Sequence, residues 1–252
     1  MKYKKLGSFV TQVYDNGILL HTSRSLRKQL SKPSRISWWI AFLFMVGSSL
    51  FASASFLLLA SLSTSDFINS TFFIGSLFFT AAAYLQYLEV INRDITVQAH
   101  INSSTQFWVW VKFRVYNLGF LASFTQFIGT LFFNVNTFEA LLNFNVLDES
   151  NLFVWTPNLL GSLLFLLSSF FAYLEIYHDK LKAFRSVTWW IIWINIFGSL
   201  FFGISALYSY NYAGGDNVFF DAISEWTTLL GAICFFIAAY LLRFEKSATP
   251  HY

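Results

Sequence analysis

The amino-acid sequence predicts an all-α, polytopic membrane protein whose six transmembrane helices form three tandem helical hairpins with pseudo-threefold repetition. The first observation is composition: 56% of the 252 residues are hydrophobic and 12% are charged, which is too apolar for a soluble domain of this size. The second is a series of six apolar runs, each long enough at about 1.5 Å per residue to cross a hydrocarbon core of about 30 Å. The third is a motif of glycine, aromatic and glutamate residues that occurs three times at one spacing.

The first 35 residues form a basic arm, which we predict to be cytoplasmic. Asn16-Gly17 separates two short apolar stretches, and Asn-Gly supplies the positive φ angles of a tight turn, so a small β-hairpin is expected here. Against one acid, Asp15, the arm carries eight bases: Lys2, Lys4, Lys5, Arg24, Arg27, Lys28, Lys32 and Arg35. These bases either only fix the topology of the first span or also bind anionic lipid, at about 1 kcal/mol per charge.

The six predicted spans lie near residues 37–61, 71–91, 113–135, 157–177, 188–210 and 226–244. Membrane-spanning strands are not expected, because these runs are continuously apolar whereas strands of a barrel alternate over about ten residues. The chain therefore divides into the basic arm (1–35) and three hairpin repeats at 36–95, 107–180 and 187–247.

Charged residues predict the orientation of the chain. All sixteen Lys and Arg residues lie in the arm, in 92–114, in 178–187 or after Leu242, and six spans place these regions on one side. The opposite loops hold seven acids and no base. The positive-inside rule then predicts that both termini are cytoplasmic. We expect a multi-pass protein of the plasma membrane. No apolar signal-peptide core follows the basic start, so the first span is expected to direct insertion.

Glycine followed by phenylalanine four residues later recurs in all six predicted helices. The glycines are Gly47, Gly75, Gly129, Gly161, Gly198 and Gly231, and each is followed by serine, threonine or alanine. Small residues let helix backbones approach closely, which is how helices associate in lipid, so these glycines are expected at helix-packing contacts. A pore wall made of the same positions is the alternative. Each repeat contains two spans, so all three copies insert the same way up, unlike inverted repeats.

Glu89, Glu175 and Glu245 follow the glycines of helices two, four and six by fourteen residues. We predict them at the cytoplasmic helix ends, where the helix dipole disfavours a carboxylate unless a cation lies near. Arg93, Lys180 and Lys246 follow within five residues and supply that charge. Two interpretations stay open: three separate anchors at the interface, or three carboxylates that converge on the pseudo-threefold axis as a cation or proton site.

No catalytic motif is present in the sequence. It contains no HExxH, GxSxG, Walker A or GxGxxG pattern, and the single cysteine, Cys234, cannot form an intrachain disulfide. We expect no cofactor, no metal and no nucleic-acid partner; the lipid bilayer is the expected partner. A non-enzymatic packing or interaction role is the first prediction, a channel or transporter between the three repeats is the second, and an enzyme site assembled from separate helices is the third.

The two-helix unit resembles a known family. FMVGSSLF (44–51) and FFIGSLFF (72–79) resemble the bacterial YrhK-like domain, a single membrane hairpin with Gly-Ser-x-x-Phe in both helices. Similar strings at 129–133, 161–165, 198–202 and 231–235 extend the resemblance over most of residues 37 to 245. This chain departs from the family in its three fused copies, in Thr130 and Ala232, and in its own N-terminal arm. The resemblance implies the hairpin unit, and it implies no established activity.

Overall fold

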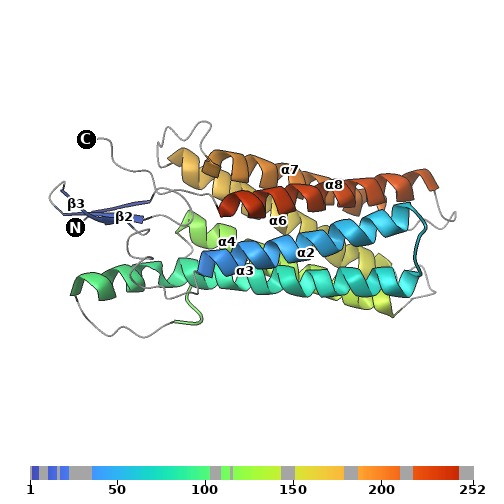
Figure 1. The fold of residues 1–252 in the computed structure, drawn as a ribbon, viewed down its shortest axis with the longest axis horizontal. Coiled ribbons are helices and arrows are strands. Elements are labelled where there is room, and N and C mark those ends of the chain that lie inside the picture. Colours follow the sequence, from blue (N-terminus) through green and yellow to red (C-terminus); the bar gives the residue numbers. More distant parts are fainter. Residues whose placement is uncertain are drawn as a thin grey trace.

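The protein is a bundle of six long helices (Figure 1). The computed structural model describes residues 2–5, 11–15, 18–22, 36–102, 109–113, 116–142, 151–178, 187–210 and 218–243. The helices are α2 (Ile36–Leu59), α3 (Ser65–Asn102), α4 (Leu118–Leu141), α6 (Thr156–His178), α7 (Val187–Tyr208) and α8 (Val218–Leu242). One π-helical turn, η1 (Asn151–Trp155), leads into α6.

All six helices are long and apolar enough to cross a membrane. Their most apolar windows have mean hydropathies of 1.4 to 2.0, and only 28% to 39% of the residues in each window are buried inside the protein. Most of the apolar surface therefore faces outward, which is the distribution expected of a lipid-facing bundle. The chain is built as a multi-pass membrane protein.

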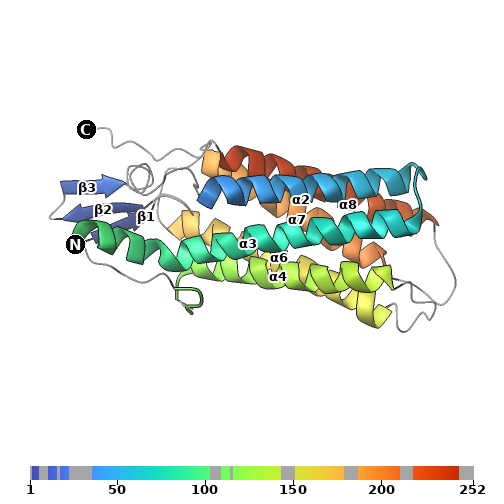
Figure 2. The same cartoon turned by 60° about the horizontal axis from the view of Figure 1, so that its bottom comes forward.

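Each helix packs against two neighbours in a closed ring. The order around the ring is α2, α3, α4, α6, α7 and α8, and α8 packs against α2. Figure 2 shows α2, α3 and α4 side by side on one face of the bundle. Neighbours in the ring are also consecutive in sequence except where α8 meets α2, so short connections suffice for an up-and-down bundle.

Several helix boundaries differ from the prediction by five residues or more, and the starts of α4 and α8 have a physical reason. α4 begins at Leu118 and not at residue 113, because Asn117 caps it: the Asn117 side chain accepts a hydrogen bond from the Phe120 backbone N–H at 3.0 Å. α8 begins at Val218, whereas the prediction starts it at 226. The acids that lowered the apolarity of this stretch include Asp221, which lies in the first turn of α8, where a negative charge complements the helix dipole.

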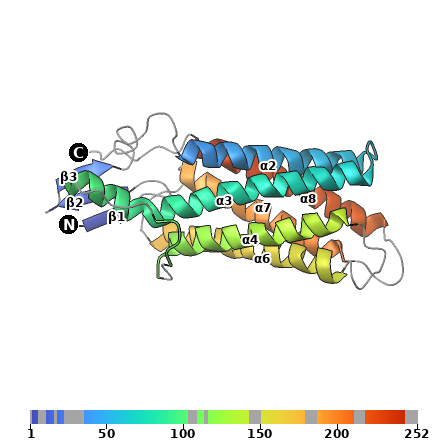
Figure 3. The same cartoon turned by 90° about the horizontal axis from the view of Figure 1, so that it is seen from below.

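α3 is the longest helix and passes the end of the bundle. One end of it extends beyond the other helices (Figure 3). It has 38 residues, and its apolar span ends at Asn92. The Asn92 side chain is 1% exposed; it donates to Val109 O at 2.7 Å and accepts from Val109 N at 2.8 Å. The Tyr87 hydroxyl accepts from Lys112 N at 3.0 Å. These bonds hold residues 109 and 112 of the α3–α4 connection against α3.

The N-terminal arm contains a small antiparallel sheet of strands β1 (Lys2–Lys5), β2 (Thr11–Asp15) and β3 (Ile18–Thr22), in that order. Asp15 pairs with Ile18 across Asn16-Gly17, where the hairpin turn is expected. Two strands were expected here, whereas the sheet has a third, β1, which pairs with β2 from Lys2–Tyr14 to Lys5–Thr11. The helical bundle is thus preceded by a short β element.

Candidate functional site

The six repeated glycines lie at contacts within the three consecutive helix pairs. A Cβ atom built on Gly75 would lie 2.8 Å from Phe51 Cδ2 of α2, and one built on Gly47 would lie 3.0 Å from Phe79 Cδ2 of α3. The absent side chain of each glycine therefore makes room for the phenylalanine ring of the partner helix. The same relation joins Gly129 with Phe165, Gly161 with Phe133 and Gly231 with Phe202. At Gly198 the approach is looser: a Cβ would lie 3.2 Å from Cys234 Cβ and 3.4 Å from Phe235 Cδ2.

The six phenylalanines that follow these glycines meet in the centre of the bundle. We call Phe51, Phe79, Phe133, Phe165, Phe202 and Phe235 the phenylalanine plug; each is 4% to 6% exposed. Phe202 contacts Phe51 and Phe133 with ring centroids 5.9 and 5.6 Å apart, and Phe235 contacts Phe79 and Phe165 at 6.1 and 5.6 Å. The remaining space between the rings is about 10 Å³, which is at the lower limit for a single water molecule.

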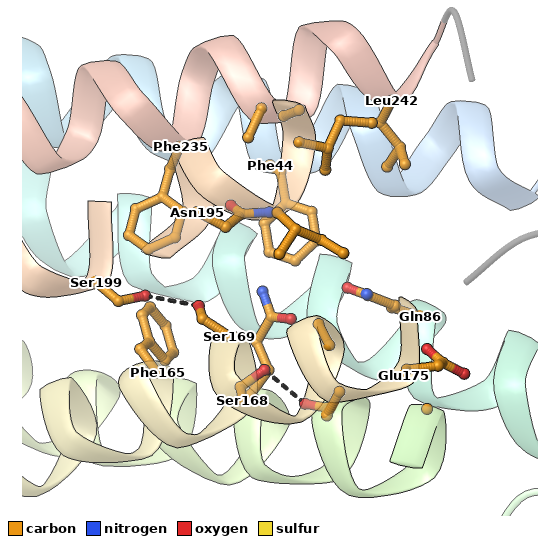
Figure 4. A pocket seen from close by; sticks show the side chains of 18 of the residues that line it. Phe44, Gln86, Phe165, Ser168, Ser169, Glu175, Asn195, Ser199, Phe235 and Leu242 are labelled. Atoms are coloured by element: carbon orange, nitrogen blue, oxygen red, sulfur yellow. Dashed lines mark hydrogen bonds between the residues drawn. The ribbon is translucent and has the colours of Figure 1, made fainter. Parts of the chain in front are cut away.

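A cavity of about 80 Å³ lies on one side of the plug, toward the end of the bundle where α2 begins and α8 ends. We call this the basic end, because the predicted topology assigns the connections that contain the Lys and Arg residues to this side. Phe165 and Phe235 of the plug line the cavity, together with seven polar side chains: Gln86, Gln126, Ser168, Ser169, Glu175, Asn195 and Ser199. Ser169 and Ser199 share a hydrogen bond of 3.0 Å, and Ser168 donates to Ala122 O at 2.7 Å (Figure 4).

A second cavity of about 170 Å³ lies on the other side of the plug, toward the opposite end, which we call the acidic end. Phe51, Phe133 and Phe202 of the plug form part of its wall. Its polar lining consists of Ser55, Asn69, Asn136, Thr137, Asn158, Ser205, Ser224, Glu225 and Thr228. Two polar cavities thus lie on opposite sides of one aromatic constriction.

The structure places the three predicted glutamates in different surroundings. Glu175 is 8% exposed and is the one acid among the described side chains that line the basic-end cavity. Glu89 is part-buried and accepts a hydrogen bond from Ser37 Oγ of α2 at 3.0 Å; it is not among the described lining residues of that cavity. Glu245 lies outside the described residues. Convergence of all three on one axis therefore stays a prediction.

Two features of the site were not assigned in the sequence analysis. Glu225 was placed in the loop before the last span, yet it lies inside α8 and lines the acidic-end cavity. The spacing of Asp221, Ser224, Glu225 and Thr228 was the available signal, because residues three and four apart share a helix face. The sequence feature that corresponds to the plug is the phenylalanine four residues after each of the six glycines. The sequence did not show that all six rings meet.

Within the described part of the chain, no group of three His, Cys, Asp or Glu side chains gathers in a way that would hold a metal ion. The polar groups of the two cavities are instead amides, hydroxyls and single carboxylates. Comparison with family models, with curated proteins and with solved structures finds no match for this chain.

Proposed function

We propose that the protein is a channel or transporter for small solutes or ions, whose path follows the axis of the bundle and is closed at the phenylalanine plug. The observation that carries this proposal is the pair of polar cavities on opposite sides of one aromatic constriction. A buried polar lining is costly inside a membrane protein and commonly marks a substrate or ion pathway. A hydrophobic constriction closes such a pathway because water does not wet it.

The sizes of the cavities support the same proposal. A water needs about 10–15 Å³ of accessible space, so cavities of 80 and 170 Å³ hold several waters each. The space within the plug is about 10 Å³. Movement of the plug rings would therefore join two hydrated cavities into one path.

The proposed architecture is three YrhK-like hairpins around a pseudo-threefold axis that coincides with this path. Its support is the recurrence of one contact, a glycine facing the phenylalanine of its partner helix, in α2 with α3, α4 with α6 and α7 with α8. The proposed location is the plasma membrane with cytoplasmic termini, and the basic arm is proposed to lie near anionic lipid. We propose no enzymatic activity.

A packing or interaction role is the competing proposal. The tight glycine–phenylalanine contacts favour it, since they are what close helix association in lipid requires. Under this proposal the cavities would be imperfections of packing and nothing would cross the bundle.

Flux through purified protein in liposomes separates the two proposals. Stopped-flow light scattering reports the passage of small neutral solutes, and entrapped fluorescent indicators report the passage of cations and protons. We expect flux above that of empty liposomes, and greater flux when Phe202→Ala removes one ring of the plug. Absence of flux in both the wild type and the folded Phe202→Ala variant would contradict transport and leave the packing role.

A further inference from the structure

The acidic-end cavity contains one carboxylate, Glu225 of α8, which is half-buried. Asp221 precedes it by four residues and therefore lies one turn earlier on the same side of the helix. The described lining of the cavity includes no Lys, Arg or His. The fixed charge that faces this cavity is therefore negative.

Three asparagines around the cavity direct their amide nitrogens into the protein. Nδ2 of Asn69 donates to Ala140 O at 3.0 Å, and Nδ2 of Asn136 donates to Val154 O at 2.7 Å. Nδ2 of Asn158 donates to Ser209 Oγ at 3.3 Å. An asparagine that uses its nitrogen in this way keeps its carbonyl oxygen as an acceptor. These three asparagines line the cavity from α3, α4 and α6, so their carbonyl oxygens are candidate neutral ligands beside the carboxylate of α8.

Ser55 on α2 supplies an independent indication of a ligand. Its side chain is 0% exposed and lines the cavity, and its Oγ has no hydrogen-bond partner among the described residues. A buried hydroxyl without a partner costs free energy, so such a group in a native structure calls for a water, an ion or a ligand beside it. Ser55 reaches the cavity from a different helix than Glu225 does.

We infer that the acidic-end cavity binds an alkali-metal cation, Na⁺ or K⁺, through the Glu225 carboxylate, the asparagine carbonyl oxygens and the Ser55 hydroxyl. Hard cations take oxygen ligands, and the described lining supplies oxygens in every polar group. One lining carboxylate balances a monovalent ion and leaves a divalent ion with excess charge in a poorly solvated site. A volume of about 170 Å³ lets the ion keep part of its hydration shell.

The role of this ion as a transported substrate rests on the proposed function, whereas its binding does not. Equilibrium binding of ²²Na⁺ and ⁸⁶Rb⁺ to the purified full-length protein in detergent tests the site directly. Choline chloride replaces the alkali salt at constant ionic strength, because choline carries the charge without a bare ion for oxygens to coordinate. We expect saturable binding of at least one of the two ions, and a rise in the unfolding temperature that choline does not reproduce.

Three variants identify the ligands. Glu225→Gln keeps the shape of the side chain and removes its charge, so it should weaken binding at least tenfold. Ser55→Ala breaks no hydrogen bond within the described protein and should fold normally, yet it should weaken binding several-fold. Glu139→Gln is the matched control: Glu139 lies on α4 near the same end but does not line the cavity, and its substitution should leave binding unchanged.

The inference is overturned if folded wild-type protein binds neither ion saturably, or if Ser55→Ala and Glu225→Gln both bind as the wild type does. Saturable binding that depends on Glu225 in a protein with no flux supports this site while it contradicts the proposed path. Cation flux in a Glu225→Gln variant that still binds both ions as the wild type does supports the path and contradicts this site.

Discussion

Phe165 of α6 packs directly onto the backbone of Gly129 of α4, so closely that a Cβ at position 129 would lie 2.7 Å from Phe165 Cδ1. The contact is reciprocal, since a Cβ at Gly161 would lie 3.0 Å from Phe133. Real Cβ atoms do not approach a ring carbon this closely. The phenylalanine ring can therefore occupy this position only because residue 129 has no side chain.

Gly129→Ala should destabilise the bundle. The added methyl group forces Phe165 or the backbone of Gly161 to move, and overpacking of this kind costs about 1–3 kcal/mol. Gly203→Ala on α7 is the control, because a Cβ there meets only Leu166 Cδ1 at 3.4 Å. Alanine is the better helix former by about 1 kcal/mol, so the control should be neutral or stabilising. Thermal unfolding in detergent measures both; equal effects would contradict the packing argument.

Phe202→Ala should open the plug. Phe202 contacts Phe51, Phe133 and Phe235, so its loss leaves a void beside the acidic-end cavity. Removal of a buried phenylalanine costs about 3–5 kcal/mol in protein cores, and circular dichroism must show that the variant is folded. We expect liposome flux to rise severalfold. Phe197→Ala, on the same helix but with a side chain 51% exposed, should change neither property.

Hydroxyl bridges join α3 to α4 and α6 to α7. Ser76 of α3 meets Thr137 of α4 at 3.0 Å, and Ser169 of α6 meets Ser199 of α7 at 3.0 Å. The positions on α8 that correspond to Ser76 and Ser169 by distance from the repeat glycine are Ala232 and Ala239. The expected partner of Ala239 on α2, Ser48, has a buried hydroxyl without a hydrogen bond among the described residues, whereas Ser55, the expected partner of Ala232, lines the acidic-end cavity. The α8–α2 contact thus lacks both bridges.

Ala239→Ser should therefore stabilise the protein by giving Ser48 a partner. Hydrogen bonds between membrane helices average about 0.6 kcal/mol and reach about 1–2 kcal/mol. A double-mutant cycle with Ser48→Ala measures the coupling, and the gain should vanish when Ser48 is absent. A gain that persists in the Ser48→Ala background, or no gain at all, would show that position 239 is not opposite Ser48 and that the three hairpins are not equivalent.

Glu175 and Glu89 should respond differently to substitution, although they hold the same place in the repeat. Glu175 lines the basic-end cavity, so Glu175→Gln is expected to lower cation flux severalfold. Glu89 faces Ser37, and Glu89→Gln keeps an oxygen that accepts the Ser37 hydrogen bond, so flux and stability should stay near the wild type. Liposome flux and thermal unfolding of both variants check this. Equal losses of flux would favour convergence of the repeated carboxylates on one axis.

Labelling of single cysteines should establish the orientation in the membrane. In a Cys234→Ala background, Tyr116→Cys reports the basic end and Val218→Cys the acidic end, because these side chains are 101% and 81% exposed. A membrane-impermeant maleimide added to intact cells should label position 218, and it should label position 116 only in inverted vesicles. The reverse pattern would place the termini outside and contradict the positive-inside prediction.

The helices could be predicted from the sequence because length and apolarity are local properties. Six long apolar runs predict spanning helices whatever their tertiary arrangement, and the structure confirms six helices of sufficient length and apolarity. Boundaries were less certain where polar residues lie inside a helix, as Asp221 and Glu225 do in α8. A hydropathy pattern treats such residues as loop, although Glu225 lines a cavity and Asp221 lies exposed in the first turn of α8.

The sequence alone thus determined the apolar helices, the regular glycine–phenylalanine spacing and the separation of bases from acids along the chain. Only the tertiary structure decided that six phenylalanines from six helices fill one constriction, that Glu175 rather than Glu89 lines a cavity, and that Ser55 and Glu225 face the same space from α2 and α8. The physical reason is that spacing within a helix fixes which residues share a face, whereas the rotation of each helix against its neighbours depends on contacts between residues far apart in the chain.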